Sequence, residues 1–179
     1  MKTALIDPER QFLGCVMQLP ITPARRLLTG MRADDFGSPV AAHVLQLAIE
    51  LVATDQTATP LALMDRARER NDIYPQTAPA PRSGAANRLQ ALGLWIADTY
   101  SDGPILPPSY YGSWLKALVL KGAYRRAVLA HAVRLEQAVA QETSTGYLRD
   151  QLDDTEHLDD LWRRYQEADG SLPRLEVAA

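Results

Sequence analysis

Four times in the first sixty residues, a side chain that can cap a helix stands directly before a proline: Asp7-Pro8, Thr22-Pro23, Ser38-Pro39 and Thr59-Pro60. Asp, Ser and Thr side chains accept hydrogen bonds from the free N–H groups of a first helical turn, and proline fits the first helical position. The four pairs therefore predict four short helices joined by tight turns. Because no segment alternates polar and apolar residues, we predict no strands.

From Ser109 to about Glu142 the sequence can form one long helix, in which apolar residues recur every three or four positions. A short turn at 143–146 is followed by a second predicted helix, from 147 to about 168, which also carries an apolar seam. Two long helices with a short link favour an antiparallel hairpin. The predicted fold class is therefore all-α, with a globular bundle of short helices followed by a long antiparallel helical hairpin.

The segment 72–87 is rich in proline, which cannot continue a helix, so it is predicted to be an exposed loop. With 46% hydrophobic residues, the chain can bury a substantial core. The predicted organisation is a helical head at 1–108, the hairpin at 109–168 and a flexible tail at 169–179.

The apolar face of the first hairpin helix is wider than one partner helix would cover. That helix is basic and the second is acidic, so opposite charges along the pair help to set their register. We therefore predict that the hairpin also buries surface against another copy, in a homodimer or a higher homo-oligomer. The predicted self-association residues are Val119, Leu120, Ala123, Tyr124, Ala127, Val128, His131, Leu135, Leu152, Leu158, Trp162 and Tyr165.

Catalytic and metal-binding patterns are missing from the sequence, which has neither a phosphate-binding G-x-x-x-x-G-K-[ST] loop nor a G-x-S-x-G motif. The three histidines lack Cys or Glu partners at ligand spacing. The side chains of Asp34, Asp35 and His43 are of the types that a small enzyme uses for acid–base chemistry. For all three, however, we favour capping and packing roles. We expect a non-enzymatic protein with no catalytic residues, metal ligands or cofactor, in which Cys15 is a small buried apolar residue.

The net charge of −3 argues against nucleic-acid binding by the whole chain, since a basic stripe is the usual footprint of that function. The alternative is a small helical DNA-binding protein, because LLTGMRADDF could link a helix-turn-helix with Arg25, Arg26 and Arg32 nearby. A single cysteine is typical of a cytosolic protein. Without a signal peptide or a long apolar run, the sequence predicts a cytoplasmic protein that does not bind membranes.

Three stretches, in this order, resemble the N-terminal domain of DnaB-type replicative DNA helicases: DPERQFLGCVM, ADDFGSPVAAHVLQLAIELVATDQTATPLAL and LVLKGAYRRAVL. The first matches a family helix with a glutamate and a Leu-Gly pair. The second matches an Asp-Phe turn, an apolar helix and a polar turn before Pro-Leu. The third matches the basic positions of the long helix. The matching positions include Glu9, Leu13, Gly14, Asp35, Phe36, Lys121, Arg125 and Arg126.

The resemblance implies an all-α head with close packing at Leu13, Gly14 and Phe36, since a glycine inside a helix costs about 1 kcal/mol unless another helix needs its space. It also implies hairpins that pair between subunits into a ring-shaped collar, which docks primase and helicase loaders in the primosome during DNA replication. The family continues into an ATPase motor. The chain is therefore expected to be either an excised collar domain or a free-standing relative that joins a replicative helicase.

Overall fold

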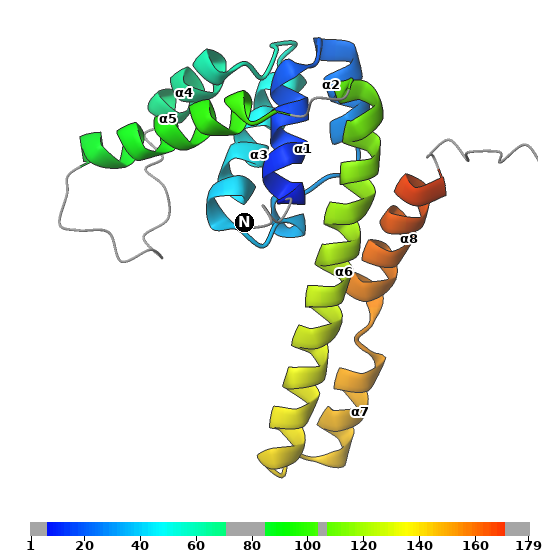
Figure 1. Cartoon of the computed structure of the whole chain (residues 1–179). Coiled ribbons are helices and arrows are strands. Elements are labelled where there is room, and N and C mark those ends of the chain that lie inside the picture. The colour runs from blue at the N-terminus through cyan, green and yellow to red at the C-terminus, as the bar shows by residue number, and fades with distance from the viewer. Residues whose placement is uncertain (1–6, 71–84, 104–106, 171–179) are drawn as a thin grey trace, which may run out of the picture.

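The computed structural model of the chain describes residues 7–70, 85–103 and 107–170, which contain helices and no strand (Figure 1). The all-α prediction is therefore confirmed. The elements in chain order are α1 (Pro8–Gln18), α2 (Ile21–Leu28), the 3₁₀ turn η1 (Ala33–Asp35), α3 (Pro39–Ala53), α4 (Pro60–Glu69), α5 (Ala85–Ser101), α6 (Pro108–Ala140), α7 (Thr145–Asp153) and α8 (Glu156–Gly170).

Three of the four cap–proline pairs begin helices as predicted. The Asp7 carboxylate accepts hydrogen bonds from two N–H groups of the first turn of α1, at 3.1 and 3.2 Å. The hydroxyls of Ser38 and Thr59 cap α3 and α4 in the same way, at 3.4 and 3.3 Å. Each helix carries its proline in the first turn, where the missing N–H group has no helical partner to lose.

The fourth prediction is wrong in position, because α2 begins at Ile21 and Thr22 already lies inside it. Pro20 occupies the capping position, and no side chain caps this helix. Pro23 still lies in the first turn, where its missing N–H group would have had no partner within the helix. The local signal therefore identified the helix but displaced its start.

The core of the head lies between α1, α2 and α3, and the first half of α6 packs on α1 and α2. Phe12, Leu13 and Val16 on α1 are completely buried, and the ring of Phe36 meets that of Phe12 edge-on at 6.0 Å. Leu115, Val119 and Leu120 of α6 belong to the same core. The predicted boundary between residues 108 and 109 therefore falls inside one continuous hydrophobic core.

Figure 1 shows that α6 runs past the head, and that α7 and α8 return along it. The second arm is not the single helix predicted from 147 to 168. It is broken at 154–155, because Asp154 has a non-helical backbone (ψ 67°) and α8 begins only at Glu156. Aspartate and threonine are weak helix formers and favour caps and turns, which explains why the break falls there.

Two predicted segment boundaries also change. Helix α5 begins at Ala85, so the loop predicted at 72–87 extends too far, and its residues up to 84 lie outside the described part of the chain. Asp169 and Gly170, assigned to the flexible tail, belong to α8, whereas 171–179 lie outside the described residues.

Candidate functional site

A cluster of charged side chains joins α8 to the turn η1; we call it the ionic cluster and define it as Arg32, Asp35, Asp160 and Arg164. The guanidinium Nη1 of Arg164 donates to Asp35 Oδ2 at 2.8 Å and to the carbonyl oxygen of Gly30 at 2.9 Å. Its Nε donates to Asp160 Oδ2 at 3.1 Å. Asp35 is only 1% exposed, so this is a buried ion pair between residues far apart in the sequence.

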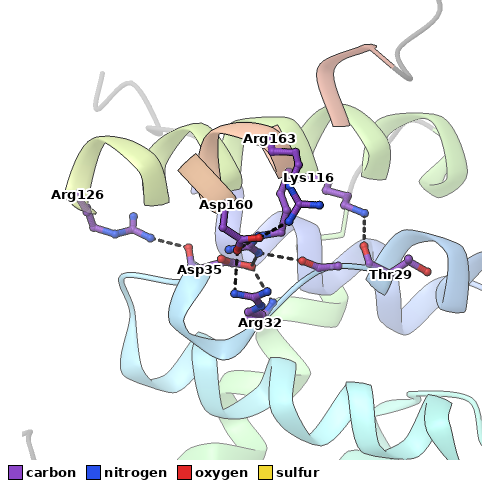
Figure 2. Close-up of polar contacts among 9 residues, drawn as sticks. Thr29, Arg32, Asp35, Lys116, Arg126, Asp160 and Arg163 are labelled. Atoms are coloured by element: carbon purple, nitrogen blue, oxygen red, sulfur yellow. Dashed lines mark hydrogen bonds and ion pairs between the residues drawn. The ribbon is translucent and has the colours of Figure 1, made fainter. Parts of the chain in front are cut away.

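Asp160 lies at the solvent side of the ionic cluster, where Arg32 reaches it at 2.9 Å and Arg163 at 2.5 Å (Figure 2). Burial disfavours its charged form. The hydrogen bond from Arg163 and the charges of Arg164 and Arg32 outweigh that effect, so the pKa of Asp160 is lowered. Both carboxylates of the ionic cluster thus have arginine partners, which is the arrangement that buried charges require.

Arg126 fixes α6 to the same turn. Its Nη2 donates to the carbonyl oxygen of Asp35 at 2.6 Å (Figure 2). Its Nη1 lies 3.3 Å from Glu9 Oε1. The Glu9 carboxylate in turn accepts the N–H groups of Gly37 at 2.7 Å and Ser38 at 3.0 Å. The segment around η1 therefore contacts α1, α6 and α8 through charged groups, and it holds the head and the two arms together.

A cavity of about 530 Å³ opens between α2, α6 and α8, and we call it the α2–α6–α8 pocket. It combines an apolar wall with hydroxyl groups and with basic side chains from all three helices. Its lining residues are Leu19, Pro23, Arg26, Leu27, Thr29, Gly30, Ser109, Ser113, Lys116, Leu120, Arg164, Glu167 and Ala168.

Lys116 is the basic group of the pocket contributed by α6. Its ammonium donates to the carbonyl oxygen of Thr29 at 2.6 Å (Figure 2). Burial lowers the pKa of Lys116, and the negative charges of Glu167 and Asp35 only partly oppose this. No carboxylate among the described residues lies within ion-pair distance of the ammonium, so burial of this charge is not compensated by a salt bridge.

The structure divides the residues predicted for self-association into three groups. Val119, Leu120 and Ala123 are buried within the chain itself, so in this structure they offer no free surface to a second copy. The head covers this stretch of α6, which sequence periodicity alone could not reveal. Tyr124, Ala127, His131, Leu135, Leu158 and Tyr165 are half-buried, while Val128, Leu152 and Trp162 are exposed.

Part of the half-buried group packs within the chain. The Tyr124 ring lies 5.2 Å from that of Trp162, and Trp162 lies 5.4 Å from Tyr165, so aromatic rings join α6 to α8. These contacts use surface that the sequence analysis had assigned to a second copy.

A different face of α6 remains uncovered. Steps of four and three residues place the following positions on one side of the helix: Leu115, Val119, Gly122, Arg126, Leu129 and Val133. The first two lie in the core of the head, whereas Leu129 is 66% and Val133 is 40% exposed. We call Leu129 and Val133 the exposed seam of α6. The face that packs on the head thus continues, beyond Arg126, into two apolar side chains that remain exposed in the described part of the chain.

Leu13, Gly14 and Phe36, the residues assigned to close packing, are all buried. A close approach that was not predicted lies at Gly112 of α6. A Cβ atom on Gly112 would lie 2.8 Å from Leu27 Cδ2 and 3.5 Å from Cys15 Cβ. The absence of a side chain there lets α6 pack tightly against α1 and α2, and a glycine early in a long predicted helix was the available signal.

Cys15 is fully buried, and burial raises the pKa of its thiol to about 12. Because the thiolate is the reactive form, we expect disulfide reagents to label native protein at pH 8 on the order of 10³-fold more slowly than unfolded protein. The unfolded thiol ionises near pH 9.0, so the stabilisation from burying the neutral thiol is complete below pH 9.0 and is lost as pH rises towards 12. Labelling with a chromogenic disulfide, with and without denaturant, measures the two labelling rates directly. Equal rates would contradict the protection of the Cys15 thiol by burial.

Most of the side chains considered for catalysis or DNA binding form ion pairs within the chain. Asp35 is paired with Arg164 in the interior, whereas Asp34 is exposed, so the two carboxylates do not form an acid–base pair. Of the arginines cited for DNA binding, Arg25 pairs with Asp55 and Arg32 pairs with Asp160. DNA binding remains a prediction, with two of its three arginines engaged within the chain.

Lys116, Asp160 and Arg164 were not selected as candidate site residues from the sequence, and Arg26 was cited only for DNA binding. The apolar side predicted for the last helix also differs from the buried side in the structure, where the buried residues of α8 are Leu161, Arg164 and Ala168. An arginine at the spacing of that apolar face was a detectable signal, since buried arginines require an acidic partner.

Among residues 7–70, 85–103 and 107–170, no group of His, Cys, Asp or Glu side chains is arranged to hold a metal ion. No helix in those ranges is long and apolar enough to span a membrane. Comparison with protein-family models, with curated proteins and with solved structures finds no match to this chain.

Proposed function

We propose that this chain is a non-enzymatic assembly module that self-associates through the exposed seam of α6. The observation that carries the proposal is the continuation of the head-packing face of α6 into Leu129 and Val133, which are exposed. Covering such a face with a second copy removes apolar surface from water, which is the main driving force of protein association.

Charges beside the exposed seam support a second copy of the same chain. Arg125 precedes Leu129 and Glu136 follows Val133, and both charged side chains are exposed. Neither one makes an ion pair with any described residue of its own chain. In an antiparallel pair of α6 helices centred on the seam, Arg125 of one copy lies close to Glu136 of the other. This two-fold arrangement uses the same patch on both copies, as closed dimers do.

The resemblance to the N-terminal domain of DnaB-type helicases supports the finer part of the proposal. We place the assembled form in DNA replication, as a cytoplasmic module that docks on a replicative helicase, a primase or a loader. Co-elution of the purified chain with each of these proteins from the same organism tests this part. Failure to bind any of them would remove the replication assignment and leave self-association to be judged separately.

Self-association is tested by light scattering coupled to size-exclusion chromatography over a wide concentration range. The wild-type mass is expected to rise from monomer to dimer with concentration. The double variant Leu129→Glu/Val133→Glu is expected to stay monomeric, because four carboxylates would meet in the interface. Leu94→Glu is the matched control, since Leu94 is 60% exposed on α5, away from the seam.

A charge exchange tests the antiparallel geometry. Arg125→Glu is expected to weaken the dimer, and Arg125→Glu/Glu136→Arg is expected to restore it, because the exchanged charges again lie opposite each other. A wild-type chain that is monomeric at every concentration would contradict self-association. A dimer insensitive to the seam substitutions would place the contact elsewhere.

A further inference from the structure

The α2–α6–α8 pocket holds two positive charges that no carboxylate in the described part of the chain pairs with, those of Arg26 and Lys116. Arg26 makes no hydrogen bond or ion pair with any residue in the described ranges. Lys116 donates once, to the Thr29 carbonyl at 2.6 Å, although an ammonium has three N–H donors. Arg164, by contrast, is neutralised by Asp35 and Asp160. Glu167, the acidic residue of the lining, lies 3.9 Å from Arg163 in an exposed pair.

The remaining wall is suited to an aliphatic group. Leu19 and Leu27 line its apolar side in front of the buried Leu120, and Pro23 and Ala168 extend it. The volume of about 530 Å³ lies in the range of small-molecule sites, which usually combine an apolar wall with a few polar groups. Ser109 and Ser113 add polar lining from the first turns of α6, where the Ser113 hydroxyl donates to the carbonyl oxygen of Ser109 at 3.4 Å.

We propose that the α2–α6–α8 pocket binds a small amphipathic anion, whose oxyanion head pairs with Lys116 and Arg26 and whose aliphatic body lies on the leucine wall. A carboxylate and a phosphate monoester share this chemistry. Pairing supplies the counter-charge that a partly buried ammonium lacks, and it opposes the lowering of the Lys116 pKa by burial. The pocket is lined by α2, α6 and α8, and neither residue of the exposed seam contributes to it, so the proposal is independent of self-association.

Titration calorimetry on the full chain tests this with four probes of equal chain length: octanoate, octyl phosphate, octanol and octylammonium. At least one of the two anions is expected to bind at one site per chain, and the stronger of them identifies the head group. Octanol and octylammonium are expected to bind at least tenfold more weakly. Octylammonium binding as tight as the anions, or no binding by either anion, would overturn the proposal.

Lys116→Met keeps the length of the side chain but removes its charge, and it is expected to weaken anion binding about tenfold or more. Arg26→Gln, at an exposed position, provides a second variant should Lys116→Met fail to fold. Arg134→Gln is the matched control, because Arg134 is an exposed arginine of α6 outside the pocket. Unchanged affinity in both folded pocket variants, or an equal loss in Arg134→Gln, would overturn the assignment of the head-group site.

Discussion

Arg164→Met is expected to destabilise the protein by about 3–5 kcal/mol, the usual cost of removing one partner of a buried ion pair. The Asp35 carboxyl group, at 1% exposure, would lose its arginine partner, and the guanidinium bond to the carbonyl oxygen of Gly30 would also be lost. Because Arg164 joins α8 to η1, the variant is expected to release α8 from the head before the rest of the chain unfolds. Chemical denaturation followed by circular dichroism measures the loss.

Arg163→Met is the matched control for this prediction. Arg163 is adjacent in sequence and also pairs with Asp160, but its side chain is 65% exposed, so its ion pairs are worth about 0–1 kcal/mol. Adding Asp35→Asn to Arg164→Met is expected to recover part of the lost stability, because the uncompensated buried charge is removed. Equal stability of the two arginine variants would contradict the buried role of Arg164.

Local signals in the sequence were sufficient to predict most of the helices. Asp7, Ser38 and Thr59 each act on N–H groups within three residues of themselves, so the chain near each cap already contains the information. The long helix α6 was predictable for a similar reason, since its apolar spacing extends over many turns and no proline interrupts it before its end.

Contacts between distant segments were not predictable in this way. Asp35 and Arg164 lie 129 positions apart, and nothing near either residue identifies the other. The division of α6 into a half buried by the head and an exposed half could not be predicted for the same reason. Leu120 and Leu129 are both leucines of one amphipathic helix, and only the position of the head decides that the first is buried and the second exposed. The predicted interface was therefore placed partly on residues that the chain covers itself.

Leu120→Ala is expected to destabilise the monomer by about 2–5 kcal/mol, as for other fully buried leucines, because it loses apolar contacts and leaves a void. Leu120 is 0% exposed and belongs to the core that joins α6 to the head. Leu129→Ala makes the same chemical change on the same helix at 66% exposure, and its effect on monomer stability is expected to stay within about 0.5 kcal/mol. Denaturation at a concentration where both proteins are monomeric measures the effect of packing on stability without the effect of association.

The two leucine variants also separate the core from the proposed interface. Leu129→Ala is expected to weaken the dimer while leaving the monomer stable, because its side chain is available to a second copy. Leu120→Ala is expected to do the reverse: the folded fraction should still associate, since its side chain already packs within the chain. If Leu120→Ala cost no more stability than Leu129→Ala and weakened the dimer more, α6 would not pack on the head as described. The surface at Val119, Leu120 and Ala123 would then be available to another chain, as the apolar spacing first predicted.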